Sequence, residues 1–359
     1  MKNKFKLWRL VVVIAIIGFV VVGCDDGGNG SGSEENGNGG DGSGMTWTAI
    51  PPENHASFSA RQIGRITYGG DRFVAVGSPG IVAYSDDGIM WTRGISAVNR
   101  VSYDIVYGDG RFVVVGGIVV VGGNGLMMRS DDGITWTVGT SSALPGDITS
   151  VGYGGGRFVA GINARMAYSD DGITWTAIPA GSEGSTFPAP GGLVSQWIRS
   201  IAYGGGKFVA GNEQGRMAYS DDGITWTAIP AGEGGSTFTN RISRITYGDG
   251  RFVAGGSEGR MAWSDDGITW NAISAGSGGS TFTSSQYIFE IAYGGGRFVA
   301  GGSEGRMAWS DDGITWNAIS AGNGGSIFTS SQYISSIVYG DGKFVAVDGE
   351  GRMAYSLWE

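Results

Sequence analysis

The stretch Tyr-Gly-Asp-Gly-Arg-Phe-Val-Ala-Gly-Gly-Ser-Glu-Gly-Arg-Met-Ala-Trp-Ser-Asp-Asp-Gly-Ile-Thr-Trp, from Tyr247 to Trp270, decides the fold because close copies of it recur along the chain. The period between copies varies from 39 to 50 residues, the range expected of blades and stacked repeats. The chain is therefore a repeat protein. The tyrosines that open the copies are Tyr68, Tyr107, Tyr153, Tyr203, Tyr247, Tyr293 and Tyr339.

Each copy divides into four short apolar segments separated by turn sequences. Glycine and aspartate fill the turns, where they can supply positive φ angles. No segment offers the roughly ten residues of helical periodicity that an amphipathic helix needs. In the copy that opens at Tyr247, the segments are residues 242 to 247, 251 to 255, 260 to 263 and 268 to 273. Four antiparallel strands per repeat predict the blade of a β-propeller.

The two ends of the repeat region match each other. Residues 44 to 51 repeat residues 223 to 230 with a single change, so the region opens with an isolated fourth strand. The last copy reaches its third strand at residues 351 to 356. We expect the first strand to complete the last repeat, which would close a ring and leave no exposed edge blade. The predicted fold is all-β, a seven-bladed β-propeller of four-stranded antiparallel blades over residues 45 to 359, closed by an N-terminal strand.

Residues 1 to 24 have the features of an export signal. Lysine and arginine precede an unbroken apolar run from Leu10 to Val22, which is too short to span a bilayer, since spanning takes about 20 residues. The sequence Val-Val-Gly-Cys ending at Cys24 resembles the lipobox of bacterial lipoproteins, in which signal peptidase II cuts before a cysteine that is acylated. The resemblance implies a lipid-anchored protein of the bacterial cell envelope, outside the cytoplasm. A short membrane anchor with an incidental cysteine is the alternative.

Residues 25 to 44 are almost entirely Gly, Asn, Ser, Asp and Glu. Such a segment cannot bury enough apolar surface to offset its ordering entropy, so we expect a disordered acidic tether. A flexible coil of this length has a reach of roughly 25 Å, enough to hold a domain clear of the bilayer. Asp25 resembles an enterobacterial signal for retention in the inner membrane, but that rule does not transfer to all bacteria, and the leaflet stays open.

The composition excludes several classes of function. The formal charge is -9, and removing the four basic residues of the leader makes the mature chain more acidic, which argues against nucleic acid as a partner. The chain has one cysteine and one histidine, which excludes an internal disulfide and a multi-histidine metal site. That histidine, His55, lies in a Pro- and Asn-containing loop without neighbours that suggest catalysis. We expect no cofactor.

The turn Ser-Asp-Asp-Gly-Ile-Thr-Trp resembles the Asp box of the BNR-repeat family, whose pattern is Ser-x-Asp-x-Gly-x-Thr-Trp. That family includes sialidases, sortilin-type receptors and a photosystem assembly factor, and the resemblance covers residues 45 to 359. One departure is that Ser264 and Trp270 are one residue closer than in the family, which predicts a shorter hairpin. The element occurs at residues 130 to 136, 169 to 175, 220 to 226, 264 to 270 and 310 to 316, and with one change at 85 to 91.

The resemblance implies a structural role for the second aspartate of each turn. It would accept backbone N–H bonds inside the hairpin, as aspartates do in turns, while the tryptophan packs against the adjacent sheet. A ring of calcium sites is the alternative, but each ion needs about six to eight oxygens and each turn offers only two carboxylates, so we expect no metal. The structural aspartates are Asp87, Asp132, Asp171, Asp222, Asp266 and Asp312.

In sialidase-like propellers, ligands use the face opposite the Asp boxes, which is built from the turns between strands two and three and from the connectors between blades. These turns carry a repeated Glu-Gly-Arg or a looser equivalent. The arginines could bind the carboxylate or sulfate groups of a ligand. Solvated turns with local ion pairs are the alternative, because the glutamates would neutralise much of the charge. The candidate arginines are Arg165, Arg216, Arg260, Arg306 and Arg352.

The connectors between blades carry aromatic residues among Ser, Thr, Asn and Gly. Flat rings stack on sugar faces and small hydroxyls add hydrogen bonds, so this pattern predicts a surface that binds carbohydrate or peptide. The alternative is that the rings fold back over the blade ends as caps. The candidate aromatic residues are Phe187, Trp197, Phe238, Phe282, Tyr287, Phe328 and Tyr333.

The resemblance to sialidases raises the question of catalysis. Sialidases have an arginine triad, a tyrosine nucleophile paired with a glutamate, a separate acid and a Phe-Arg-Ile-Pro motif. That motif is absent, and the arginines lie at repeated positions, as scaffold residues do. These observations favour no catalytic residues, although two carboxylates from distant blades could still converge to form a glycosidase.

The sequence therefore predicts a monomeric lipoprotein whose propeller is a noncatalytic binding module for a glycan or an extracellular ligand, with the lipid bilayer as a second partner through Cys24. A scaffold or assembly factor for envelope protein complexes is the first alternative, and a sialidase-like glycoside hydrolase is the second. The near identity of the fifth and sixth repeats favours a smooth, quasi-symmetric surface over one asymmetric active site.

Overall fold

The computed structural model of the chain describes residues 45–55, 63–95, 100–117, 125–139, 145–179, 187, 196–232, 234–274, 281–320, 327–328 and 332–358. All of them lie in one compact unit, Gly39–Glu359. The predicted signal sequence, the lipidated Cys24 and the tether fall outside the described residues. Within the described part, no helix has the length and apolar character needed to cross a membrane.

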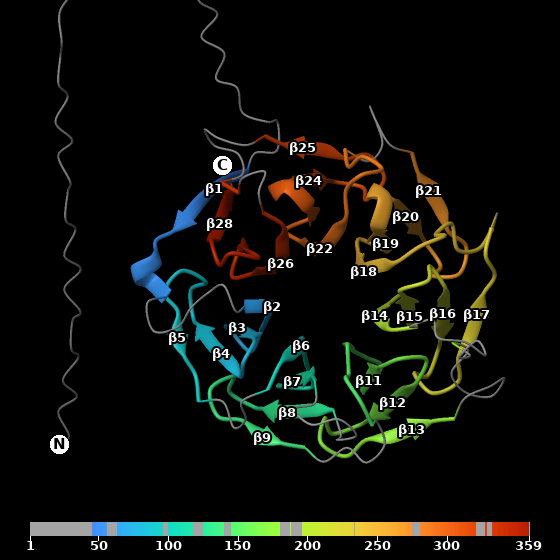
Figure 1. Cartoon of the computed structure of the whole chain (residues 1–359), viewed down its shortest axis with the longest axis horizontal. Helices are drawn as coiled ribbons and strands as arrows, with labels where there is room; N and C mark the ends of the chain where they lie inside the picture. The colour runs from blue at the N-terminus through green and yellow to red at the C-terminus, as the bar shows by residue number, and fades with distance from the viewer. Residues whose placement is uncertain are drawn as a thin grey trace, which may run out of the picture. The chain divides into compact units, whose positions relative to one another are not determined.

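The described strands form seven antiparallel sheets of four strands each, arranged as the blades of a ring (Figure 1). This confirms the predicted seven-bladed β-propeller. The short 3-10 helices of the described ranges are η1 (Pro52–His55), η3 (Ser257–Gly259) and η4 (Ser303–Gly305).

From the inner to the outer strand, blade 1 consists of β2 (Ile63–Gly69), β3 (Arg72–Gly77), β4 (Ile81–Ser85) and β5 (Thr92–Arg93). Blade 2 consists of β6 (Ser102–Gly108), β7 (Arg111–Gly116), β8 (Leu126–Ser130) and β9 (Thr137–Val138). Blade 3 consists of β10 (Ser150–Gly154), β11 (Arg157–Gly161), β12 (Met166–Ser169) and β13 (Thr176–Ile178). Blade 4 consists of β14 (Ile198–Gly204), β15 (Lys207–Asn212), β16 (Met217–Ser220) and β17 (Thr227–Ile229).

Blade 5 consists of β18 (Ile242–Gly248), β19 (Arg251–Gly256), β20 (Met261–Ser264) and β21 (Asn271–Ile273). Blade 6 consists of β22 (Ile288–Gly294), β23 (Arg297–Gly302), β24 (Met307–Ser310) and β25 (Asn317–Ile319). Blade 7 consists of β26 (Ile334–Gly340), β27 (Lys343–Asp348), β28 (Met353–Trp358) and β1 (Met45–Ile50).

Contacts between the inner strands close the ring. Each inner strand packs on that of the next blade, and β26 of blade 7 packs on β2 of blade 1. Blade 7 takes its outer strand from the start of the repeat region, because β1 pairs antiparallel with β28, and Ile50 lies opposite Met353. Segments from the two ends of the sequence thus share one sheet, in blue and red in Figure 1.

Seven apolar clusters fill the interfaces between neighbouring blades. Between blades 4 and 5, Val209 and Met217 of one sheet pack with Ile245, Phe252 and Trp270 of the other. Trp270 is the last residue of the Ser-Asp-Asp-Gly-Ile-Thr-Trp turn, and it is 2% exposed. The turn is therefore anchored in the interface between two blades by a large buried ring.

The tyrosine that opens each repeat packs on the preceding blade. A Cβ at Gly248, which follows Tyr247, would lie 2.0 Å from Cγ of Tyr293 in the next blade. Only glycine allows the backbone and the ring to approach this closely. The same contact closes the ring, because a Cβ at Gly340 of blade 7 would lie 2.2 Å from Cγ of Tyr68 in blade 1.

The turn between the third and fourth strands is held by its own side chains. In blade 5, Asp266 Oδ1 accepts N–H bonds from Ile268 at 2.8 Å and from Thr269 at 2.7 Å. The Ser264 hydroxyl donates to the same oxygen at 3.0 Å and accepts the N–H of Gly267 at 2.8 Å. Equivalent carboxylate bonds are made by Asp87, Asp132, Asp171, Asp222 and Asp312.

The first aspartate of each pair has a different role. Arg251, at the start of β19, donates from Nε to Asp265 of its own blade at 2.8 Å. Its Nη1 donates to the carbonyl oxygen of Asp312 in the next blade at 2.6 Å. Equivalent pairs of bonds are made by Arg72 and Arg157. This side of the propeller, which we call the turn face, therefore has repeated contacts that join several blades to the next.

Six of the seven inner strands contain a β-bulge near their start. In β18, Ile242 and Arg244 oppose Gly256 and Gly255, so Ser243 is an extra residue. A bulge changes the direction of the side chains beside it. We call the side of the propeller where the inner strands begin the connector face, because the connectors between blades arrive there.

Candidate binding site

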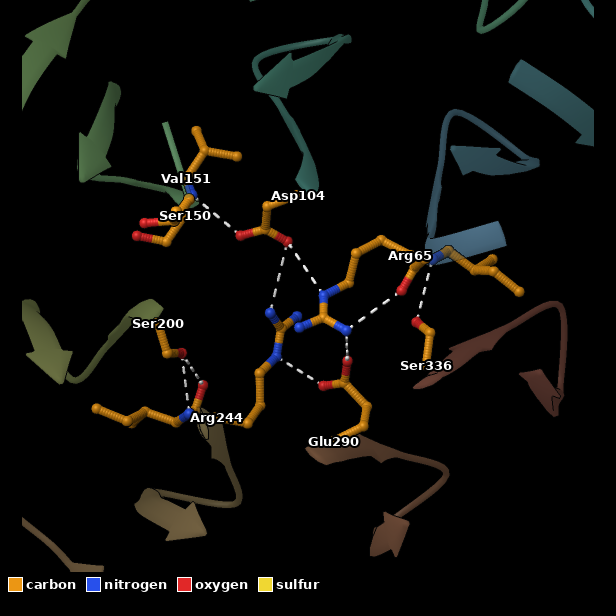
Figure 2. Close-up of polar contacts among 12 residues, drawn as sticks. Arg65, Asp104, Ser150, Val151, Ser200, Arg244, Glu290 and Ser336 are labelled. Atoms are coloured by element: carbon orange, nitrogen blue, oxygen red, sulfur yellow. Dashed lines mark hydrogen bonds and ion pairs between the residues drawn. The ribbon is translucent and has the colours of Figure 1, made fainter. Parts of the chain in front are cut away.

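One residue of each inner strand, three positions before the repeat tyrosine, either extends to the axis of the ring or bonds the next blade (Figure 2). We call it the axial position. Three blades have serine there, whereas the other four have a charged residue. In blade order, the axial residues are Arg65, Asp104, Ser150, Ser200, Arg244, Glu290 and Ser336.

Short axial side chains join neighbouring blades. The Ser200 hydroxyl accepts the N–H of Ile245 in the next blade at 2.9 Å. Asp104 keeps the same bond with a carboxylate, because its Oδ2 accepts the N–H of Val151 at 3.0 Å. One oxygen of Asp104 is thus used in the scaffold, and the other, Oδ1, points to the axis (Figure 2).

The four charged axial residues form one ion-pair network across the axis (Figure 2). Arg244 Nε lies 2.6 Å from Glu290 Oε1, and Arg244 Nη1 lies 3.6 Å from Asp104 Oδ1. Arg65 Nε lies 3.7 Å from Asp104 Oδ1, and Arg65 Nη1 lies 3.8 Å from Glu290 Oε2. Each carboxylate therefore faces both guanidinium groups, and the network joins blades 1, 2, 5 and 6.

The carboxylates are the buried members of this network. The side chains of Asp104 and Glu290 are 3% and 1% exposed, whereas those of Arg65 and Arg244 are 20% and 25% exposed. Burial raises the pKa of Glu290, although Arg244 and Arg65 oppose this shift. Burial alone would lower the pKa of Arg244, but Glu290 and Asp104 outweigh it and raise that pKa. The arginine side chains thus keep some exposure to solvent, whereas the carboxylates are buried.

Several polar atoms of the axial network have no hydrogen-bond partner among the described residues. They are Oδ1 of Asp104, Oε2 of Glu290, Nε of Arg65 and Nε of Arg244, the last of which lies 2.6 Å from Glu290 Oε1 without the geometry of a hydrogen bond. The ion pairs of the other three atoms, at 3.6 to 3.8 Å, are longer than hydrogen bonds, which span about 2.7 to 3.2 Å. Attraction between opposite charges therefore holds these atoms together, and the loss of one member would leave a buried charge without compensation.

A rim of residues surrounds the start of the inner strands on the connector face. In five blades, the residue immediately before the inner strand is the first residue of this rim. Its carbonyl oxygen accepts an N–H from the turn between the second and third strands, which fixes its position. Arg241, for example, accepts from Ser257 at 3.0 Å. The residues fixed in this way are Val101, Trp197, Arg241, Tyr287 and Tyr333. We call these five the connector rim, together with three residues that follow two positions later on the same strands, Tyr103, Arg199 and Phe289.

Aromatic rings gather on the rim of blades 6 and 7. The rings of Tyr287 and Phe289 are inclined by 12° with centroids 5.8 Å apart, and the centroids of Phe289 and Tyr333 are 5.3 Å apart. Tyr287 is 44% exposed and Tyr333 is 48% exposed. We call these three residues the aromatic ledge. Its two tyrosines, whose side chains carry both an apolar ring and a hydroxyl group, are thus partly exposed to solvent.

Arginines occupy the rim of blades 4 and 5. Arg199 binds Glu213 through Nε at 3.0 Å and Nη2 at 2.5 Å. Arg241 makes no ion pair with a carboxylate of the described residues, and its buried Nε has no hydrogen-bond partner among them. Burial, and then the neighbouring cation Arg199, lowers the pKa of Arg241, while Glu213 opposes this shift. This part of the rim therefore has two guanidinium groups for one carboxylate.

The structure separates the aromatic residues that the sequence grouped together. The four phenylalanines are buried in apolar clusters between blades, at Phe187 1%, Phe238 4%, Phe282 1% and Phe328 2% exposed. Their prediction as surface binding residues is corrected: they cap the blade ends, because folding the connector back removes a large apolar ring from water. Tyr287 and Tyr333 lie on the aromatic ledge, and Trp197 is a partly buried rim residue.

The predicted arginines lie in the turns between the second and third strands, outside the inner strands. Three of them make local ion pairs, Arg260 with Glu258 at 3.0 Å, Arg306 with Glu304 at 3.4 Å and Arg352 with Asp348 at 3.1 Å. The other two, Arg165 and Arg216, are exposed in equivalent turns. The pairs of Arg260 and Arg306 agree with the alternative of solvated turns, because each glutamate is exposed and offsets the charge of its arginine, whereas Asp348 is buried and also accepts backbone N–H bonds.

The described residues contain no group of three or more His, Cys, Asp or Glu side chains that could hold a metal ion. The axial carboxylates Asp104 and Glu290 are buried, and each faces two guanidinium groups. A glycosidase instead needs two carboxyl groups that flank a bound sugar. The rim, by contrast, offers two guanidinium groups and the rings of the aromatic ledge to a ligand.

The sequence interpretation missed the axial network and the two rim arginines. A signal was present, because the position three residues before each repeat tyrosine has serine in three copies and Arg, Asp, Arg or Glu in the other four. Aligning the copies position by position would have revealed charged residues inside an otherwise apolar strand. Their convergence at one axis needs the ring itself.

No protein-family model and no curated protein matches this chain. Solved structures share its fold. YCF48 from Cyanidioschyzon merolae aligns with a TM-score of 0.60 and 17% sequence identity, over 87% of this chain and 98% of that chain. A structure of YCF48 bound to D1 peptide aligns with a TM-score of 0.62 and 16% identity, over 88% of this chain and 96% of that chain.

The extracellular domain of the one-component system BT4673 from B. thetaiotaomicron also aligns. Its TM-score is 0.60 at 14% identity, over 86% of this chain and 39% of that chain. At such low identities, these similarities show the propeller fold alone. The function of this chain therefore has to be argued from its own residues.

Proposed function

We propose that the propeller is a noncatalytic binding module whose ligand is a glycan bound at the connector rim. The observation that carries the proposal is the aromatic ledge. Tyr287 and Tyr333 are each nearly half exposed, and the ring of each packs on Phe289. Sugars stack on such rings and accept hydrogen bonds from such hydroxyls, so the ledge suits a saccharide.

The absence of catalysis is part of this proposal. Its support is that the axial carboxylates Asp104 and Glu290 are buried and face guanidinium groups, so a substrate would not reach them. We also assign the propeller to the Asp-box group of the sialidase-like superfamily. The support is the bonding of Asp266 and Ser264 within the turn.

The proposal includes a place in the cell. We infer that the chain is a monomeric lipoprotein of the bacterial cell envelope, anchored in the bilayer through acylated Cys24 and carrying the propeller outside the cytoplasm on a tether of residues 25 to 44. The lipobox-like sequence before Cys24 supports this. Metabolic labelling with palmitate would test it, because Cys24→Ser should abolish both the label and membrane fractionation.

A broad glycan array tests the proposed binding. The purified protein should retain a small set of saccharides, and the double variant Tyr287→Ala with Tyr333→Ala should lose them. The double variant Arg260→Ala with Arg306→Ala is the matched control, since these exposed residues lie in turns outside the rim. Retention that persists without the two tyrosines would contradict a site on the ledge, and an array that stays empty would contradict a glycan ligand.

Assembly of envelope protein complexes is the second candidate function. The observation that favours it is that a protein of the same fold, YCF48, is known bound to D1 peptide. A photocrosslinking amino acid at position 287 would then trap one envelope protein in cells. Crosslinking to many proteins, or to none, would contradict this alternative.

A further inference from the structure

Arginines from several blades converge on the connector side of the axis. Arg199 and Arg241 lie on the rim of blades 4 and 5, and Arg65 extends from blade 1 towards blade 7, where its Nη1 donates to the carbonyl oxygen of Ser335 at 2.6 Å. Arg65 also acts electrostatically on Arg241. A ligand that settles on the rim would therefore meet positive charge beside the aromatic ledge.

The carboxylates at this place do not balance the arginines. Within the axial network, two guanidinium groups face two carboxylates, and the charges cancel. On the rim, the ionisable groups that act on Arg241 are Arg199 and Arg65, both cations, the phenol of Tyr287 and the single carboxylate of Glu213. Glu213 is already bound by Arg199 through two nitrogens. The charge of Arg241 is thus the one that an incoming anion could offset.

We infer that Arg241 is the anion-binding residue of the connector rim and that the glycan bound there is acidic, with a carboxylate or sulfate group held by Arg241 and a sugar ring on Tyr287. This inference rests on the proposed glycan-binding function. A guanidinium group suits the role, because its planar donors match the oxygens of carboxylates and sulfates in pairs.

The scaffold presents Arg241 and Tyr287 in equivalent places. Each is the first rim residue of its blade, and its carbonyl oxygen accepts an N–H, from Ser257 at 3.0 Å and from Ser303 at 2.8 Å respectively. A Cβ at Gly256 would lie 2.0 Å from the carbonyl oxygen of Arg241, so the backbone there is closely packed. Two adjacent blades therefore offer a cation and an aromatic ring from a rigid frame, which lowers the entropy lost on binding.

An acidic peptide is the competing ligand. Extended peptides commonly bind by adding a strand to an exposed sheet edge. The free edges of the inner strands face the axis, where bonds between blades such as Ser200 to Ile245 and the axial network take up this space. The rim offers ring surfaces and a guanidinium group instead of a strand edge, and that combination favours a sugar.

The test is an array on which each acidic oligosaccharide, uronate or sulfated, is spotted beside its neutral counterpart, a methyl ester or a desulfated form. The full purified chain should retain at least one acidic member about 10-fold more strongly than its neutral partner, as expected for one charge-assisted interaction. This preference should weaken as salt is raised.

Two variants locate the preference. Arg241→Gln should bring the ratio of acidic to neutral retention to about 1, while weaker binding of neutral sugars on the ledge persists. Arg260→Gln is the matched control and should keep the ratio, because Arg260 is exposed and already paired with Glu258. Equal urea midpoints for the variants and the unchanged protein would show that folding is intact.

The outcomes separate this inference from the proposed function. Equal retention of acidic and neutral members would overturn the anion inference and leave glycan binding in place. A preference that survives Arg241→Gln would overturn the assignment to Arg241. An acidic peptide on the same array that is retained more strongly than every saccharide would overturn the choice of a sugar. An array that retains no saccharide would overturn the proposed function itself.

Discussion

The turn face and the connector rim are built from the same seven repeats, yet their copies vary in opposite ways. On the turn face, the aspartate equivalent to Asp266 recurs in six turns, with the same backbone bonds. On the rim, the first residues of neighbouring blades are as different as Trp197, Arg241 and Tyr287. The turn face therefore repeats the same residues from blade to blade, whereas the rim has a different residue in each of these blades.

The difference lies in which atoms carry the scaffold. The turn face uses side chains, because Asp266 and Ser264 make the bonds that shape the turn. The rim uses the backbone, because the carbonyl oxygens of Arg241 and Tyr287 accept N–H bonds that do not involve the side chains at these positions. Side chains can therefore specialise on the rim without loss of the fold, whereas on the turn face they cannot.

Side chains at the axial position also join the blades, although they differ between copies. Substitution there gives the largest predicted loss of unfolding free energy. Arg244→Ala would leave the buried carboxylates of Glu290 and Asp104 undercompensated, at a cost of about 3 to 5 kcal/mol in unfolding free energy. Replacing both partners, Arg244→Met with Glu290→Met, should cost far less, because no unpaired charge remains between them. Urea unfolding measures both, and a cost below about 1 kcal/mol for Arg244→Ala would contradict the account.

The contact between repeat tyrosines and glycines gives the second effect. Gly248→Ala would place a Cβ 2.0 Å from Cγ of Tyr293, and we expect a loss of about 1 to 3 kcal/mol from overpacking. Gly64→Ala is the matched control on another inner strand, because its Cβ would meet nothing closer than 3.8 Å and its cost should stay within about 0.5 kcal/mol. Similar costs for the two substitutions in urea unfolding would contradict this packing.

The two aspartates of one turn should differ. Asp266→Ala removes the acceptor for two backbone N–H groups and should cost about 1 to 2 kcal/mol. Asp265→Ala removes an ion pair with Arg251 whose carboxylate is 62% exposed, and it should cost about 0 to 1 kcal/mol. If Asp265→Ala proved the more damaging in urea unfolding, the roles of the two aspartates would have to be exchanged.

The smallest predicted effect is a pH dependence of opposite sign in the two regions. Burial would raise the pKa of Asp171, but N–H groups of Thr174 and Ile173 and the Ser169 hydroxyl lower it from 3.8 to about 2. A lowered pKa in the folded state stabilises above the unfolded value, so this contribution should disappear as the pH falls from about 4 to about 2. Urea midpoints of Asp171→Asn should therefore depend less on pH in that window than those of the unchanged protein.

Glu290 should behave in the opposite way. Burial raises its pKa in the folded state, so its contribution to stability is fully present below the unfolded pKa and is lost as the pH rises through the folded value. Glu290→Gln should therefore gain stability relative to the unchanged protein as the pH rises above about 4. A parallel pH dependence for Glu290→Gln and Asp171→Asn would contradict the assigned directions.

The fold could be predicted from the sequence because its determinants are local and repeated. Apolar segments, glycine turns and the Ser-Asp-Asp-Gly-Ile-Thr-Trp element each define a strand or a hairpin within one copy. The ion pairs of the outer turns were equally local, since Glu258 and Arg260 are two residues apart. Such features need no knowledge of neighbouring blades.

The site could not be predicted in the same way, because its parts come from different blades. Arg199, Arg241 and Tyr287 become neighbours only when blades 4, 5 and 6 stand side by side. The sequence of a connector also does not show which of its aromatic rings are buried and which are exposed. Phe282 and Tyr287 are five residues apart in one connector, yet the ring without a polar atom is buried and the ring with a hydroxyl stays exposed.

The central claim is that the connector rim binds the ligand while the turn face serves as scaffold. Hydroxyl-radical footprinting of the full chain tests it directly, with the saccharide that the array retains most strongly. Tyr287 and Tyr333 on the rim and Met90 on the turn face are 44%, 48% and 56% exposed, so all three should be oxidised in the free protein. We predict that the ligand protects both tyrosines and leaves Met90 unchanged. Protection of Met90 with unchanged tyrosines would contradict the account.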